Sequence, residues 1–249
     1  LQVNRDLASA QARLREARAR RALAQADLYP SADVSGAVSR SKSSRETGSG
    51  RRIELYQAGF DAAWEPDVFG GQRRGLEAAQ ADVEQSAASL EAVRVSLAAE
   101  TALNYVEMRA FQARLDVARR NLATQAETLQ LTDWRAQAGL ASALEVEQAR
   151  TVLEQTRAQI PLLEAGLAQA QNRIAVLLAR TPAALDEAVL RPGPIPAASE
   201  SIAAGIPADA LRRRPDVRAA ERRLAAETAR IGQVESARYP AFRLSGSIG

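Results

Sequence analysis

The sequence predicts a mainly α-helical fold that carries one β-hairpin. Three observations lead to this prediction. Apolar residues recur every seven positions over the middle of the chain, which indicates long helices that pack as antiparallel coiled coils. Polar and apolar residues alternate over a stretch near the start, which is typical of strands. The last 36 residues repeat the pattern of the beginning, which indicates a duplicated unit.

The repeat becomes visible when residues 4–39 are aligned with residues 214–249. Ten of these 36 pairs are identical, and they include the Tyr-Pro steps at positions 29–30 and 239–240. In both copies a helical pattern precedes the Tyr-Pro step and an alternating pattern follows it. The sequence therefore predicts a helix that leads into a strand, twice.

The first copy gives a helix over residues 1–30 and a hairpin over residues 31–65. Pro30 ends the helix, because a proline pushes the residue before it toward extended geometry. A polar, glycine-containing turn at 45–52 separates two alternating runs. Each run has about the 9–11 residues that a tilted strand needs to cross a bilayer.

A long helical hairpin is predicted over residues 66–180, with its tip at 132–142. Gly139 interrupts the helical pattern as a C-cap, and Ser142 follows as the N-cap of the second helix. Glu145 stands three residues after Ser142 and completes a capping box.

Apolar residues spaced seven apart mark the packing seam of this helical hairpin. In the first helix a four-residue stutter separates two heptad series. In the second helix, Pro161 falls inside the seam, where we expect a kink or a break in register. The seam positions are Leu76, Val83, Leu90, Leu97, Leu115, Leu122 and Leu129, then Val146, Leu153, Ile160, Leu167 and Ile174.

Residues 181–213 form a proline-rich connector with short helices at most. The second-repeat helix is predicted over 214–238, with Pro215 in its first turn, where a missing N–H costs nothing. Residues 239–249 begin a third strand. We expect both ends of the chain to be cut, since it starts within a helical pattern and stops within a strand pattern.

The composition argues against catalysis. The chain contains no histidine and no cysteine, so the commonest general base, the thiol nucleophile and the commonest metal ligands are missing. We therefore expect no enzyme activity, no cofactor and no metal. The formal net charge is only +3, and acidic residues are interleaved with arginines, so we expect no nucleic-acid binding.

Four segments, spread over the whole chain in order, resemble the TolC-type outer-membrane efflux proteins, in particular the lipoprotein channels of pumps of the RND type. The segments are Ala26-Asp27-Leu28-Tyr29-Pro30-Ser31, Trp64-Glu65-Pro66-Asp67-Val68-Phe69-Gly70-Gly71-Gln72-Arg73-Arg74, Ala138-Gly139-Leu140-Ala141-Ser142 and Leu211-Arg212-Arg213-Arg214-Pro215-Asp216-Val217-Arg218. Pro66 departs from the family's usual aliphatic residue. The resemblance covers the first repeat and the start of the second.

This resemblance implies a homotrimer in the outer membrane of a Gram-negative bacterium, extending into the periplasm. Each protomer would give strands to a shared 12-stranded β-barrel and long helices to one α-barrel. It also implies a passive exit duct of a tripartite efflux pump, with a periplasmic adaptor (membrane fusion) protein and an inner-membrane RND-type transporter as partners. The exported substrate stays open, and the gate of the family lies largely in the second repeat.

The resemblance also assigns roles to individual residues. On the second strand, Tyr56, Phe60 and Trp64 are expected to face the outer-membrane lipid, and Asp61 is expected to face the lumen. The helix turn is expected to contact the adaptor, through Gly139, Leu140, Ser142, Glu145 and Val146.

Two classes of alternative remain open from the residues alone. The hairpin could be soluble and lie with its apolar face against a core. The chain could then be a periplasmic adaptor, although no Gly-rich β segments flank the helices, or a plain coiled-coil scaffold without membrane insertion. The Tyr-Pro step at both ends argues against a plain scaffold.

Overall fold

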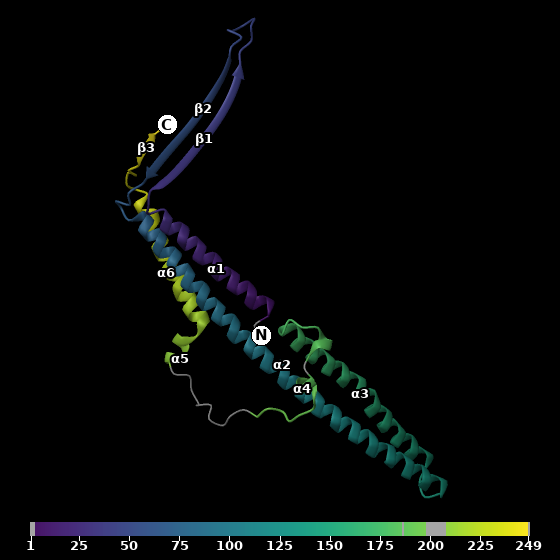
Figure 1. The fold of residues 1–249 in the computed structure, drawn as a ribbon. Coiled ribbons are helices and arrows are strands. Elements are labelled where there is room, and N and C mark those ends of the chain that lie inside the picture. The colour runs from purple at the N-terminus through teal and green to yellow at the C-terminus, as the bar shows by residue number, and fades with distance from the viewer. Residues whose placement is uncertain (1–2, 186, 198–207, 249) are drawn as a thin grey trace. The chain divides into compact units, whose positions relative to one another are not determined.

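The protein is described here by a computed structural model, which covers residues 3–185, 187–197 and 208–248. Its elements, shown in Figure 1, are α1 (Arg5–Ala26), β1 (Ser31–Lys42), β2 (Arg52–Trp64), α2 (Gly71–Gln137), α3 (Ala143–Leu177), the 3-10 helix η1 (Pro182–Ala184), α4 (Glu187–Leu190), α5 (Ala208–Arg213), α6 (Pro215–Ser236) and β3 (Leu244–Ile248). The expectations for residues 1–2, 186, 198–207 and 249 lie outside the described residues.

The structure divides into two compact units, which are described separately. The first contains Leu1–Ser9 and Ala92–Ile206, and the second contains Ala10–Glu91 and Pro207–Gly249. The duplicated pattern corresponds to real elements: α1 and α6 both have 22 residues, and their bounds are offset by 210 positions (215 − 5 and 236 − 26). Each of the two helices is followed by a strand.

In the first unit, the later part of α2 packs against α3. Six of the predicted seam positions are buried, namely Leu90 at the edge of the second unit and then Leu97, Leu115, Val146, Leu153 and Ile174. Met108 and Ala170 lie at the centre of the cluster, and Phe111 packs against it. α3 continues through Pro161 to Leu177, so the proline does not end the helix.

The connector after α3 is fastened to α2 by polar side chains. Arg109, only 6% exposed, donates to the backbone carbonyl of Arg191 and to the Tyr105 hydroxyl at 2.7 Å. Gln112 donates to the carbonyl of Leu190 at 2.9 Å. These bonds satisfy carbonyls of a segment that has little regular structure of its own.

In the second unit, α1, the beginning of α2 and α6 pack through small side chains, including Ala17, Ala78, Ala81 and Ala226. Ion pairs also join α6 to α2, between Arg222 and Glu84 at 3.1 Å and between Arg230 and Asp82 at 2.6 Å. Alanine brings helix axes close together, so long polar side chains can pair across the outside of the contact.

The three strands form one antiparallel sheet in the order β1-β2-β3. β1 pairs with β2 along its whole length, and β3 pairs with the end of β2 that is nearest to α2, where Trp64 lies opposite Leu244. β2 begins at Arg52, one residue before the predicted run, whereas β1 ends at Lys42, two residues short of the predicted turn.

Among residues 3–185, 187–197 and 208–248, no helix combines the length and the apolar character needed to cross a membrane.

Candidate functional site

The two faces of the sheet differ in polarity nearer the helices. Tyr56, Phe60 and Trp64 alternate along β2 and therefore lie on the same side. The register continues this side onto the neighbouring strands, where Val34 lies opposite Phe60, Val38 opposite Tyr56 and Ile248 opposite Phe60. All of these side chains are exposed in this chain.

The opposite side of the sheet carries the apolar residues Leu55 and Ile53 toward the turn and is polar nearer the helices. Asp61 lies there, directly across from Asp33 on β1 and from Ser247 on β3. Ser35 and Ser39 lie on the same side of β1. The structure therefore separates the three predicted lipid-facing residues from the predicted lumen-facing aspartate by the thickness of the sheet.

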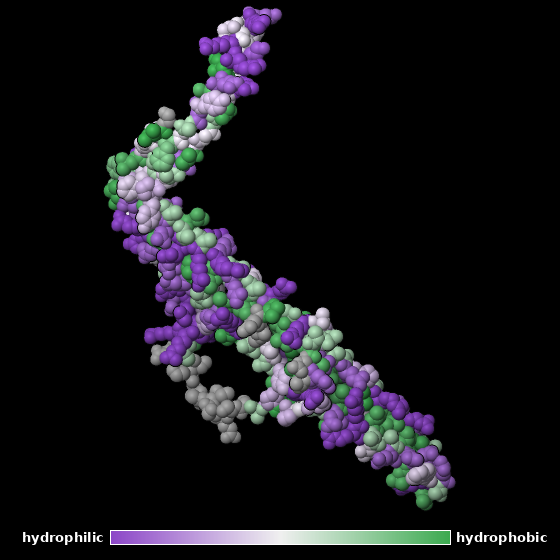
Figure 2. Space-filling model, in the orientation of Figure 1, coloured by the Kyte–Doolittle hydropathy of each residue, from purple (hydrophilic) through white to green (hydrophobic). Residues whose placement is uncertain are grey.

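The apolar side ends before the turn of the hairpin. The next pair on that side is Arg40 and Glu54, which form an ion pair at 2.5 Å, and the pair after that is Lys42 and Arg52. Figure 2 shows the change, with hydrophilic residues gathered at the turn and hydrophobic ones nearer the helices.

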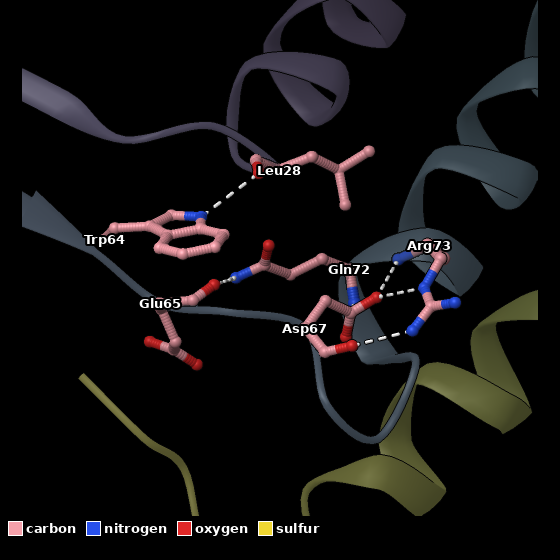
Figure 3. A network of polar contacts seen from close by, with 6 residues as sticks. All are labelled: Leu28, Trp64, Glu65, Asp67, Gln72 and Arg73. Atoms are coloured by element: carbon pink, nitrogen blue, oxygen red, sulfur yellow. Dashed lines mark hydrogen bonds and ion pairs between the residues drawn. The ribbon is translucent and has the colours of Figure 1, made fainter. Parts of the chain in front are cut away.

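The joint between β2 and α2 is held by a polar network (Figure 3). Trp64 Nε1 donates to the carbonyl of Leu28 at 3.2 Å, and Gln72 Nε2 donates to the carbonyl of Glu65 at 3.2 Å. The Asp67 carboxylate accepts from the backbone N–H groups of Gln72 and Arg73, at 3.2 and 2.9 Å. Asp67 thus caps the open N-terminus of α2.

Arg73 strengthens this cap, because its Nε donates to Asp67 Oδ2 at 3.0 Å and its Nη2 to the Asp67 carbonyl at 2.7 Å. Burial on its own raises the pKa of the Asp67 carboxyl. The hydrogen bonds from Arg73 and from the backbone of Gln72 outweigh this effect, so the pKa lies below its ordinary value.

Two consecutive glycines start α2 for different reasons. Gly70 has a φ of +80°, a left-handed conformation that favours glycine. Gly71 lies so close to α6 that a Cβ would be 2.1 Å from the Ser236 hydroxyl oxygen. The close approach of α6 therefore explains the glycine at this position.

The helix turn between α2 and α3 has the predicted caps. Gly139 has a φ of +74°, its N–H bonds to the Ala136 carbonyl at 2.9 Å, and the N–H of Leu140 bonds to the Arg135 carbonyl at 2.8 Å. This is a complete Schellman motif. After the turn, Ser142 and Glu145 form the predicted capping box.

The residues of this turn differ in their accessibility. Gly139, Leu140, Ser142 and Glu145 are exposed, and Leu140 is 71% exposed. Val146 is only 8% exposed, because it also begins the packing seam of α3.

Sequence reasoning missed two apolar residues near the turn. Leu144 is 67% exposed and Trp134 is 58% exposed. Both lie off the heptad positions, and this mismatch with the seam was the signal that could have revealed them.

No group of three or more acidic residues is placed to hold a metal ion among residues 3–185, 187–197 and 208–248.

Comparison with known proteins identifies the family. A family model described as "Outer membrane efflux protein" matches residues 1–180. Nodulation protein T from Rhizobium leguminosarum bv. viciae is 39% identical over 185 residues, which cover 74% of this chain and 38% of that protein. The toluene efflux pump outer membrane protein TtgF from Pseudomonas putida is 33% identical over 253 residues, covering 100% of this chain and 52% of TtgF.

A solved structure of the outer-membrane channel OprN is similar to this chain with a TM-score of 0.88 and 40% sequence identity, covering 99% of this chain and 56% of that one. The chain thus spans about half the length, or less, of the curated relatives it matches. A match over residues 1–180, together with these relatives, places the chain in the outer membrane efflux protein family.

Proposed function

We propose that this chain is part of the exit duct of a tripartite efflux pump, with its hairpin in the outer membrane and its long helices in the periplasm. The observation that carries the proposal is the exposed apolar side of the sheet. Within the second unit, no described segment covers Val34, Tyr56 or Phe60. A soluble hairpin would pack these apolar side chains against a core, because exposed apolar area is unfavourable in water.

The sheet also has free edges, which supports closure with other copies. Among the described residues, β1 has a neighbour on one side only, and β3 pairs over five residues. In lipid each unpaired backbone group costs several kcal/mol, so strands cross a bilayer only as part of a closed barrel. We infer that the strands of several protomers close this barrel, and that the protein is a homotrimer as in the wider family.

The proposed facing follows from the two sides of the sheet. Tyr56, Phe60 and Trp64 contact lipid, and Asp61 faces the aqueous lumen. Trp64 lies at the helical end of the apolar side, where its Nε1 donates to a carbonyl outside the strand. This combination of an apolar ring and a satisfied polar atom suits a membrane interface.

The helix turn is the proposed contact with a periplasmic adaptor, which would connect the duct to an inner-membrane RND-type transporter. Leu140 and Leu144 supply an exposed apolar surface there, on a turn that is rigid because both caps are complete. Gly139, Ser142 and Glu145 shape the turn and remain accessible. Val146 is buried, so in this proposal it supports the turn from within.

Transport through such a duct needs no chemistry by this chain. We propose a passive conduit without catalytic activity, with energy supplied by the inner-membrane transporter. The name of TtgF refers to toluene, and that substrate is a property of TtgF; the residues of this chain do not select one substrate class.

The test of membrane insertion compares two neighbouring substitutions in the full-length protein. Phe60→Arg places a charge on the lipid side, which costs about 2–4 kcal/mol near the middle of the bilayer. We expect it to abolish detergent-extractable trimer in the outer-membrane fraction. Asp61→Asn, one residue away on the other side, should leave the trimer intact. Equal effects of the two substitutions would contradict the facing, and a wild-type protein that stays soluble in the periplasm would favour the adaptor or scaffold alternative.

The adaptor contact is tested by Leu140→Asp, with Leu162→Asp as a control, since Leu162 is similarly exposed on α3 away from the turn. We expect Leu140→Asp to assemble normally but to lose cross-linking to the adaptor and export. A variant that still cross-links and exports would rule this contact out.

A further inference from the structure

The turn end of the sheet carries cations on the side that is otherwise apolar. Beyond the last apolar pair, Val38 and Tyr56, the register places Arg40 opposite Glu54 and then Lys42 opposite Arg52. Since alternate residues share a side, all four charged side chains lie on the same side as Tyr56. On this side of the sheet, the residues therefore change from apolar to charged within one step of the register.

The pair of Arg40 and Glu54 has no net charge, whereas the pair of Lys42 and Arg52 carries two positive charges. Arg40 and Glu54 form an ion pair at 2.5 Å, and Tyr56 donates to Glu54 at 3.3 Å. Lys42 and Arg52 carry the same charge, and neither has an ion-pair partner within the part of the chain that the structure describes. Like charges directly opposite each other destabilise a sheet unless an anion lies between them.

Lys42 and Arg52 lie at the depth along the strand that is expected for the surface of a bilayer. Measured from Trp64, the last apolar residue on this side of β2, Tyr56, lies about 20 Å away in depth and Arg52 about 30 Å, for a strand that rises about 3.3 Å per residue and is tilted by about 40°. The apolar band of outer-membrane barrels is about 25 Å tall. Lys42 and Arg52 lie about 5 Å beyond this band, at the level of lipid headgroups.

We propose that Lys42 and Arg52 together bind the phosphate of an anionic lipid headgroup, in the leaflet nearest to the turn of the hairpin. The proposal rests on the proposed function, because it requires the sheet to be inserted in a membrane. An arginine guanidinium offers a planar pair of donors to phosphate, and a lysine ammonium adds a flexible point charge. The bound phosphate would also remove the repulsion between the two cations.

The experiment uses the full-length trimer purified in a neutral detergent. Phosphatidylglycerol and phosphatidylcholine are added at equal concentration, and native mass spectrometry counts the lipids that stay bound. The wild-type trimer should retain phosphatidylglycerol preferentially. The double variant Lys42→Gln/Arg52→Gln should reduce this preference about 25-fold, since each basic residue near an anionic surface contributes about a factor of five.

The matched control is Arg45→Gln/Arg51→Gln, which removes the same charge from the turn between the strands. This control should keep the preference, and the single variant Arg52→Gln should lie between the wild type and the double variant. An unchanged preference in the double variant, or an equal loss in the control, would overturn the proposal. Displacement of the lipid by inorganic phosphate at equal concentration would show a site for free anions and would overturn it as well.

The assembly state separates this inference from the proposed function. If no wild-type trimer is found in the outer-membrane fraction, the proposed function fails and the lipid site fails with it. An intact trimer without any headgroup preference would refute the lipid site alone.

Discussion

Replacing Gly166 by alanine tests how tightly α2 and α3 pack in the first unit. Gly166 lies on α3, and a Cβ at this position would be 2.5 Å from Cε1 and 2.6 Å from Cζ of Phe111 on α2. Carbon atoms in good contact are about 3.5–4.0 Å apart, so the ring or one of the helices has to move by about 1 Å. The ring cannot move freely, because it packs against the cluster around Met108.

Two opposing effects determine the size of the change. Alanine is favoured over glycine inside a helix by about 1 kcal/mol. Overpacking of a well-filled contact costs about 1–3 kcal/mol. We therefore expect a net destabilisation of about 1 kcal/mol. In a protein with Phe111→Leu the clash is relieved, so the same glycine substitution should become neutral or stabilising.

The assay is thermal unfolding of the detergent-solubilised full-length protein, followed by circular dichroism at 222 nm. A loss of about 1 kcal/mol lowers the midpoint by about 2–4 °C for a unit of this size. The control is Gly75→Ala on α2, where a Cβ would meet only the flexible amide end of Gln233, at 3.1 Å. A midpoint that rises equally in Gly166→Ala and Gly75→Ala would refute the close packing.

Three further predictions concern the ends of the helices. Ser142→Ala removes the capping box of α3 and should cost about 0.5–2 kcal/mol, which proteolysis of the turn would detect as faster cleavage. Gly139→Ala should cost about 1 kcal/mol from backbone strain alone, since no atom lies within 4 Å, whereas Gly139→Asn should cost less; an equal loss of thermal stability would contradict this. Asp67 has a lowered pKa, so its charge stabilises the fold at pH values above the unfolded value of about 3.8, and this contribution is lost as the pH falls through the lower, folded pKa. The gap in unfolding midpoint between wild type and Asp67→Asn should therefore be present at neutral pH and shrink below about pH 3.8; a gap that is the same at all pH values would argue against a charge effect.

Features set by neighbouring residues could be predicted from the sequence. The caps at Gly139 and Ser142 depend on contacts within six residues, and both appear in the structure as expected. The heptad seam also depends on local spacing, and residues such as Leu115 and Leu153 are buried. The offset of 210 residues between α1 and α6 follows directly from the repeat.

Features set by distant residues could not be predicted. The pairing of β3 with β2, rather than with β1, depends on a partner far away in the sequence. Arg109 has an ordinary helical surface pattern around it, yet it is buried under the connector through its bond to Arg191, 82 positions away. The sequence assigned Val146 both to the packing seam and to the proposed contact surface, and the structure shows it buried.

The two copies of the repeated helix show how far a duplicated sequence determines structure. Both helices need partners for the free N–H groups of their first turn. In α1 the side chain of Asn4 accepts from the N–H groups of Asp6 and Leu7, at 2.8 and 3.1 Å, and donates to the Leu177 carbonyl at the end of α3, at 3.0 Å.

The second copy begins differently. Arg214 makes no side-chain cap, Pro215 removes one donor, and Arg214 instead forms an ion pair with Asp216 at 2.7 Å. Asn4 is buried, whereas Arg214 is exposed. The aspartate is shared by both copies, at positions 6 and 216, but the residue two positions before it differs, because Asn4 bonds to the end of α3 whereas Arg214 directly follows α5. A repeat therefore specifies the length of the helix and its step into the strand, while the anchoring of the helix start is specified by the residue that meets the surrounding chain.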